Sequence, residues 1–268
     1  MPSEDCKPLT DCRLQTDCGG RGVRACDARK PGELVIVRRF ANLAKKLVPD
    51  PLFGWLRRFG TALLTPISFS YQTGHFKSSL GRAPMDRHGN PIPWYTYPAI
   101  HFLQSKDLCD KRVLEFGAGY STLWWAKYAG SVIAFEDNPE WYEQLQPKVP
   151  TNVSLHYVGN GEPLPDCAAL SGQTFDIIVI DGLKREYCAQ LAPKLLAPDG
   201  ALVIDNAEGY GSSGYRSIVE PFCQQGFRRV DFYGYAPGVS QPHCTSIVFG
   251  KSTFLFASSR GPRVPFLE

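Results

Sequence analysis

From about residue 99 onward, short apolar runs alternate with segments whose apolar residues recur at helical spacing. The pattern predicts strands at 112–116, 131–136, 152–158, 175–181, 201–206, 227–234 and 243–250, and helices at 121–130, 138–146, 186–197 and 217–225. The run FDIIVID is apolar almost throughout, as expected of a parallel strand that is covered on both faces. This alternation predicts an α/β protein with a doubly wound sheet.

Single residues mark the expected helix ends. Asn138 followed by Pro139 is typical of an N-cap and a first helical position, and Gly130 is typical of a helix end. Pro193 is expected to kink or restart the helix at 186–197, and Pro221 to distort the one at 217–225.

The pattern is different before residue 99. The stretch 33–65 predicts two short amphipathic helices, split at Pro49-Asp50-Pro51, and glycines and prolines indicate a loop over 66–98. The predicted organisation is a Cys-rich disordered tail over 1–32, a helical and loop extension over 33–98, the α/β domain over 99–250 and a C-terminal tail over 251–268.

Composition restricts the class of protein. A hydrophobic content of 43% and a charged content of 21% are ordinary for a globular protein, and the net charge of +3 does not indicate nucleic-acid binding. No apolar run reaches the roughly 18 residues of a spanning helix, and the N-terminal residues lack the apolar region of a secretory signal. A cytoplasmic location is therefore the expectation.

The nine cysteines fall into two groups. Five are scattered through the main body and are interpreted as small buried hydrophobic residues. The four in the head, Cys6, Cys12, Cys18 and Cys26, have spacings that match no common zinc pattern. A disordered tail is therefore favoured over a metal site.

The stretch VLEFGAGYST (113–122) ends the first expected strand with two glycines. Glycine permits close backbone approach, and the following helix points its N-terminus at the same place. A dinucleotide fingerprint needs a third glycine where Thr122 stands, and Glu115 would repel a pyrophosphate. Glu115 suits a cationic ligand, such as the amino group of S-adenosylmethionine. A turn that merely links strand and helix is the alternative.

A second acid supports the nucleoside interpretation. Glu136 ends the second expected strand, where it can accept both ribose hydroxyls, and Asp137 can share that role. Together the two motifs resemble the class I S-adenosylmethionine-dependent methyltransferases, over residues 99–250. The resemblance implies a Rossmann-like sheet of seven strands with an antiparallel last strand. It also implies that Gly117, Gly119, Tyr120 and Ser121 line the cofactor site.

Two further strand ends carry polar residues: Asp181 with Lys184, and Asp205 with Asn206. Oxygen ligands of this kind suit magnesium. The set resembles the catechol and caffeoyl-coenzyme A O-methyltransferases. The resemblance implies that Asp181, Asp205 and Asn206 hold the metal and that Lys184 takes the acceptor's proton. Metal-free methyltransferases also carry acids at strand ends, and a histidine such as His75 is then the alternative base.

The methyl acceptor is expected to be a small molecule held by residues 75–100. Trp94, Tyr95, Tyr97 and Ser78 are the candidate contacts, joined by Glu208 after the fifth strand of the domain. A surface segment whose aromatic side chains fill the edge of the core is the alternative interpretation.

The basic amphipathic stretch over 34–64 leaves three alternatives open: binding to an anionic membrane, a helical cap, or a homodimer contact. The function predicted from the whole sequence is O-methylation of a small molecule with S-adenosylmethionine, with or without Mg²⁺. A metal-independent N- or O-methyltransferase, or a cofactor-binding accessory protein at a membrane surface, are the alternatives.

Overall fold

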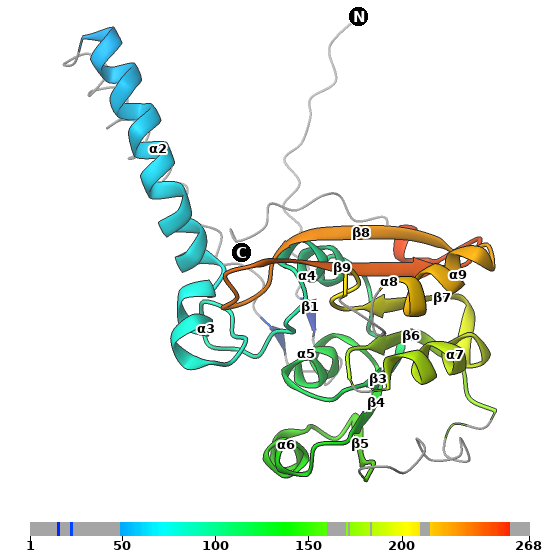
Figure 1. Ribbon diagram of the computed structural model, residues 1–268. Coiled ribbons are helices and arrows are strands. Elements are labelled where there is room, and N and C mark those ends of the chain that lie inside the picture. Colours follow the sequence, from blue (N-terminus) through cyan, green and yellow to red (C-terminus); the bar gives the residue numbers. More distant parts are fainter. Residues whose placement is uncertain are drawn as a thin grey trace, which may run out of the picture.

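The computed structural model describes residues 15–16, 22–23, 49–159, 170, 172–182, 184–209 and 215–257. A sheet of seven strands forms its centre (Figure 1). The strands are β3 (Arg112–Phe116), β4 (Ser131–Glu136), β5 (Val153–Tyr157), β6 (Phe175–Ile180), β7 (Leu196–Ile204), β8 (Arg228–Tyr235) and β9 (Pro242–Phe249). Their order in the sheet is β5-β4-β3-β6-β7-β9-β8.

The strand directions confirm the predicted sheet. The five strands from β5 to β7 run parallel, whereas β9 runs antiparallel to both of its neighbours, β7 and β8. The last strand along the chain is therefore the antiparallel one, and it lies inside the sheet rather than at its edge. The fold is a doubly wound, Rossmann-like α/β sheet.

Helices cover both faces of the sheet (Figure 1). They are α4 (Tyr97–Gln104), α5 (Tyr120–Tyr128), α6 (Pro139–Leu145), α7 (Arg185–Leu195), α8 (Tyr215–Ile218) and α9 (Glu220–Gln224), with short 3-10 helices η1 (Gln146–Lys148) and η4 (Phe254–Phe256). One core joins the sheet to α4, α5, α6 and η4, and a second joins it to α7, α8 and α9. Five of the six residues of β6 are buried, which explains its apolar sequence.

Several local signals act as predicted. Asn138 caps α6, because its Oδ1 accepts the backbone N–H of Trp141 at 2.9 Å. The helix expected over 217–225 is divided into α8 and α9, and Pro221 lies in the first turn of α9. Pro193, by contrast, is accommodated inside α7, which is one helix up to Leu195.

The extension before the domain is more helical than expected. Helix α2 (Asp50–Gln72) begins at the predicted prolines but continues through Pro66, so the first part of the expected loop over 66–98 is wrong. Pro66 removes one helical hydrogen bond, but this does not end the helix. Helix α3 (His75–Gly81) follows it. The first of the two predicted amphipathic helices lies outside the described residues.

Helix α2 projects away from the sheet and its covering helices, with α3 at its foot (Figure 1). In the head of the chain, the expectation of no regular structure is wrong at four residues. Strands β1 (Gln15–Thr16) and β2 (Gly22–Val23) form a short antiparallel pair. The four head cysteines lie outside the described residues.

Candidate cofactor site

The winding of the sheet reverses between β3 and β6, which is where ligands bind in doubly wound folds. Gly117 follows β3 with φ of 98°, and Gly182 follows β6. A Cβ on Gly117 would lie 2.6 Å from the Cα of Gly182, and one on Gly182 would lie 2.8 Å from the Cα of Gly117. The two turns therefore touch through their backbones, and each needs glycine because of the other.

Gly119 is placed differently. Its φ of −175° is ordinary extended backbone, and the nearest atom to an added Cβ is Trp141 Nε1 at 3.6 Å. A side chain at this position meets open space or ordinary contact. Of the two glycines in the turn, Gly117 is required by packing, while Gly119 leaves free room at the N-terminus of α5.

Glu115 lies under this turn and is completely buried. Its Oε2 accepts the hydroxyl of Thr122 at 2.5 Å, and that hydroxyl in turn accepts the Gly119 N–H at 2.8 Å. Its second oxygen, Oε1, is buried without a well-aligned hydrogen-bond partner among the described residues. Burial raises the pKa of Glu115 to about 8, although the hydroxyls of Thr122 and Ser121 act in the opposite direction.

Glu136 ends β4 next to the turn. It is 7% exposed, and its Oε1 accepts the backbone N–H of Asn138 at 2.9 Å. Burial is the largest cause that raises its pKa, and the neighbouring Asp137 carboxylate adds to the effect. Asp137 itself is half-buried. Both predicted ribose contacts therefore lie at the carboxyl edge of the sheet beside the glycine turn.

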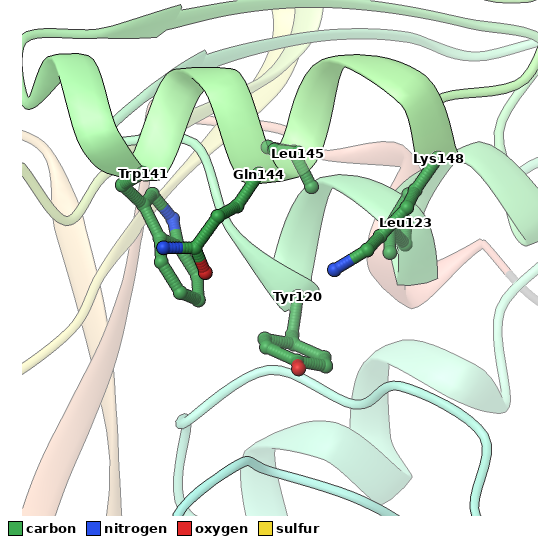
Figure 2. Close-up of a pocket in the computed structure, with 6 residues that line it drawn as sticks. All are labelled: Tyr120, Leu123, Trp141, Gln144, Leu145 and Lys148. Atoms are coloured by element: carbon green, nitrogen blue, oxygen red, sulfur yellow. The ribbon is translucent and has the colours of Figure 1, made fainter.

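A shallow hollow opens between α5 and the α6–η1 segment (Figure 2). Tyr120 and Trp141 face each other there with ring centroids 5.8 Å apart. Trp141 also donates from Nε1 to the carbonyl of Ala118 at 2.8 Å, which ties α6 to the glycine turn. The remaining lining residues are Leu123, Gln144, Leu145 and Lys148. Ser121, by contrast, is buried in the first turn of α5.

Asp181 directly follows β6, and Asp205 directly follows β7. Burial raises the pKa of Asp181 to about 6, and the Arg185 guanidinium acts against this shift from 2.9 Å away. Burial also raises the pKa of Asp205, and the Asp181 charge contributes. Arg185 joins both strand ends, because it also donates to the carbonyls of Gly182 and Asp205.

The three predicted metal ligands turn to different partners. Asp181 pairs with Arg185, Asp205 Oδ1 accepts the Thr245 hydroxyl at 2.7 Å, and the Asn206 amide lies 3.0 Å from His243 Nδ1. Among the described residues, no group of three His, Cys, Asp or Glu side chains is arranged to hold a metal ion. Each of the three side chains is therefore engaged separately, where the resemblance implied one shared ion site.

The two predicted bases lie in different surroundings. Lys184 is exposed and precedes α7, with a left-handed φ of 55°. Asn206, after β7, is left-handed too, with φ of 47°. His75 packs instead against Tyr97 and Tyr235, and its Nδ1 accepts the Gly238 N–H at 3.3 Å, in the loop between β8 and β9. Burial lowers the pKa of His75.

The predicted acceptor contacts are mostly part of the protein interior. Tyr95 is fully buried and accepts from Trp125 Nε1 at 3.2 Å, and Tyr97 is 4% exposed. Ser78 is buried as well, and its hydroxyl bonds to the backbone of Met85 in both directions. These three side chains are therefore part of the protein interior and do not line an open pocket. This favours the alternative for residues 75–100, in which aromatic side chains fill the edge of the core.

Trp94 and Glu208 are the two exposed members of that set. Trp94 is 44% exposed and donates from Nε1 to the Pro237 carbonyl at 3.2 Å. Glu208 accepts the Cys244 N–H at 2.9 Å, and its Oε1 is 3.3 Å from His243 Nδ1. Trp94 therefore lies beside the loop between β8 and β9, and Glu208 lies beside the first residues of β9.

Sequence reasoning missed three side chains that organise the site. Thr122 occupies the position where a dinucleotide fingerprint has glycine, and it braces Glu115. Arg185 is four residues after Asp181 and pairs with it along the chain, a spacing that could have been noticed. Thr245 lies in β9, and no local pattern connects it to Asp205.

The Arg185 contacts lead to a first prediction. Replacement by methionine should lower the free energy of unfolding by about 2 kcal/mol, because a half-buried Asp181 carboxylate loses its partner. Urea denaturation at pH 7 measures the change. Lys194→Met, an exposed basic residue near the end of the same helix, is the control and should change stability by less than about 0.5 kcal/mol. Equal effects would contradict the role of Arg185.

Comparisons with known proteins show no family for this chain. No protein-family model matches the chain, and no curated protein matches it. Many solved structures resemble it, and three of them are described here. Cofactor-bound Rv0187 from MTB is 19% identical, covers 77% of this chain and 100% of its own, and has a TM-score of 0.48. An O-methyltransferase from Bacillus cereus in complex with SAH is 16% identical, with 72% and 96% covered and a TM-score of 0.47.

The third structure is TomG, an O-methyltransferase from Streptomyces achromogenes involved in tomaymycin synthesis and solved with SAM. It is 17% identical, with 72% of this chain and 94% of its own covered and a TM-score of 0.46. At identities and scores this low, the likeness assigns no activity to this chain. Its chemistry has to come from its own residues.

Proposed function

We propose that this protein is an S-adenosylmethionine-dependent methyltransferase that acts on an oxygen atom of a small molecule. The observation that carries the proposal is the acidic edge of the sheet. Four carboxyl groups lie along this edge. Glu115 and Glu136 are within the last two residues of β3 and β4, and Asp181 and Asp205 directly follow β6 and β7. Burial is the largest cause that raises the pKa of each of them. An edge of this kind favours a positively charged ligand.

The charge of the ligand separates the candidate cofactors. A dinucleotide would bring a negatively charged pyrophosphate to Glu115, whose Oε1 is an acceptor without a well-aligned partner among the described residues. S-adenosylmethionine carries an ammonium and a sulfonium group, so it would stabilise the ionised carboxylates. Glu136, at the end of the neighbouring strand, is the acceptor proposed for the ribose hydroxyls. Gly119 has no side chain, so its backbone would remain accessible to the ligand.

The reaction needs orientation more than strong acid–base chemistry. When bound, the cofactor supplies an electrophilic methyl group on a positively charged sulfur. Glu115 and the glycine turn would hold and orient the methionine part. Methyl transfer would form a bond from the acceptor oxygen to the methyl carbon as the carbon–sulfur bond breaks. The electron pair of the carbon–sulfur bond would stay on the sulfur. The acceptor's proton passes to a base or to water.

We propose that this transfer proceeds without a metal ion, which was the alternative mechanism for the sequence. The partners of Asp181, Asp205 and Asn206 support it, since each polar side chain is already engaged with a different residue. Lys184 is kept as the proposed base, because it is exposed and follows the same strand as Asp181. His75 is the weaker candidate, because its Nδ1 accepts a backbone hydrogen bond.

Calorimetric titration tests the cofactor assignment. S-adenosylhomocysteine should bind the full chain with a dissociation constant in the micromolar range, and S-adenosylmethionine more tightly because of its additional charge. NAD is the matched control, since it shares the adenosine but carries a pyrophosphate. Binding of NAD with equal or greater affinity, or binding of neither compound, would contradict the methyltransferase proposal.

The same titrations with magnesium and with a chelator test the metal. Cofactor affinity and methyl transfer to catechol-type and other small hydroxyl acceptors should be unchanged in chelator. A loss of transfer in chelator, restored by magnesium, would return Asp181, Asp205 and Asn206 to the role of metal ligands. Cofactor binding without transfer to any acceptor would support the accessory-protein alternative.

A further inference from the structure

Helix α2 has a large apolar surface that nothing in the described residues covers. It contains no buried residue over its 23 positions. Six large side chains along it are each between 44% and 60% exposed: Leu52, Trp55, Leu56, Phe59, Leu63 and Ile67. Figure 1 shows the helix pointing away from the domain, and its last turns contact α3 and, through Phe69, Tyr97 of α4. An exposed apolar surface of this extent is typical of an interaction site.

These side chains gather on one side of the helix. Their spacing of three and four residues places them in one stripe, because successive residues of an α-helix are about 100° apart. Trp55 and Phe59 stack within it, with ring centroids 5.4 Å apart. The opposite side carries Thr61, Thr65 and Ser68, and Arg57 and Arg58 lie at its two borders with the stripe. The helix is therefore amphipathic, and its apolar side faces outward.

The charge around the stripe is mainly positive. Residues 50–85, which include α2 and α3, contain four basic residues and one acidic residue, Asp50 at the start of α2. The basic residues are Arg57, Arg58, Lys77 and Arg82. Two more exposed apolar side chains, Phe76 at 63% and Leu80 at 73%, lie in α3 at the foot of the helix. The surface thus offers apolar contact and positive charge together, and it complements a partner that is apolar inside and anionic outside.

An anionic lipid surface has that chemistry, and a second copy of this chain does not. In a symmetric contact the same patch lies on both subunits, so two surfaces of net positive charge would face each other. Crossing the bilayer is also disfavoured, since no helix among the described residues is long and apolar enough to span one. A helix with an apolar stripe and basic borders lies in the plane of the lipid headgroups instead.

We propose that α2 is a membrane-surface helix that holds this protein on anionic lipid. Trp55 and its neighbours in the stripe enter the boundary between headgroups and acyl chains. Arg57 and Arg58 remain at the level of the headgroup phosphates, and the α/β domain is carried outside the bilayer. This proposal is independent of the methyltransferase proposal, because no residue of α2 belongs to the cofactor site.

Vesicle co-sedimentation of the full chain tests it. The protein should bind vesicles of phosphatidylcholine with about 30% phosphatidylserine more than tenfold better than vesicles of phosphatidylcholine alone. The double variant Phe59→Glu/Leu63→Glu should bind about 100-fold more weakly, because it removes two inserted side chains and adds two negative charges. Thr61→Glu/Thr65→Glu is the matched control: it adds the same charge on the polar side and should lose about tenfold at most.

Two measurements keep the test decisive. Circular dichroism and binding of S-adenosylhomocysteine should be the same for both variants, so a loss of vesicle binding cannot come from an unfolded domain. Light scattering without lipid should give the same molar mass for the two variants. The proposal is overturned if the full chain does not bind anionic vesicles or if both double variants lose binding equally. It is also overturned if only the Phe59→Glu/Leu63→Glu variant changes from a dimer to a monomer.

Discussion

Gly117→Ala is expected to lower the free energy of unfolding by about 3 kcal/mol and to abolish cofactor binding. Its φ of 98° is strained for alanine, and the new Cβ would lie 2.6 Å from the backbone of Gly182. Neither backbone can move aside without shifting the other turn, and both turns border the proposed cofactor site. Urea denaturation and titration with S-adenosylhomocysteine measure the two effects.

Gly119→Ala is the matched control for this prediction. The position has extended backbone, and an added Cβ is 3.6 Å or more from its neighbours. Its stability should stay within about 0.5 kcal/mol of the wild-type value. Any weakening of cofactor binding by this variant would then show that the cofactor occupies the space next to Gly119. If the two alanine variants were equally stable, the contact between the turns would not be the reason for glycine at position 117.

Glu115→Gln is expected to give the second large effect, a loss of cofactor affinity of about 100-fold at pH 8. The variant keeps an acceptor for the Thr122 hydroxyl but cannot become negatively charged. In the wild-type protein the pKa of Glu115 is about 8, so the free protein carries a neutral carboxyl at pH 6. A cationic ligand binds the ionised form, so affinity should rise about tenfold from pH 6 to pH 7 and about fivefold from pH 7 to pH 8. The variant should show no such rise.

Stability without cofactor should change with pH in the opposite direction. The folded-state pKa of Glu115 lies above its usual value of 4.5, so the folded protein binds more protons than the unfolded chain between these two values. The stabilising contribution of this group is complete below pH 4.5 and is lost as the pH rises toward 8, by about 3 kcal/mol at pH 7. Denaturation curves of wild type and Glu115→Gln across this range isolate it. Parallel pH dependences would contradict the raised pKa.

The centre of the sheet could be predicted from sequence because its strands are largely apolar runs separated by clear helix signals. The run FDIIVID and the Asn138-Pro139 pair each specify local structure without help from distant residues. The end of α2 could not be predicted in this way, because Pro66 and the glycines that follow indicate a break. The helix nevertheless continues through Pro66 despite that one missing hydrogen bond.

The candidate site was only partly predictable for a related reason. Glu115 and Glu136 were identifiable because their strands end at the same edge of the sheet. The partners of Asp181 and Asp205 were not, because a strand end specifies position but not the direction of the side chain. Thr245 reaches Asp205 across 40 residues, through the pairing of β7 with β9. Such a contact exists only in the folded sheet.

The position of β9 has a consequence for synthesis of the protein. This strand is made last, yet it separates β7 from β8, and its Thr245 supports Asp205 at the proposed site. In a nascent chain that still lacks residues 242–249, β8 has no partner strand, β7 lacks its neighbour on one side, and Asp205 lacks the Thr245 hydroxyl. The sheet therefore cannot be completed on the ribosome before residues 242–249 have been synthesised. Premature termination before this strand should give an aggregating product instead of a partly active one.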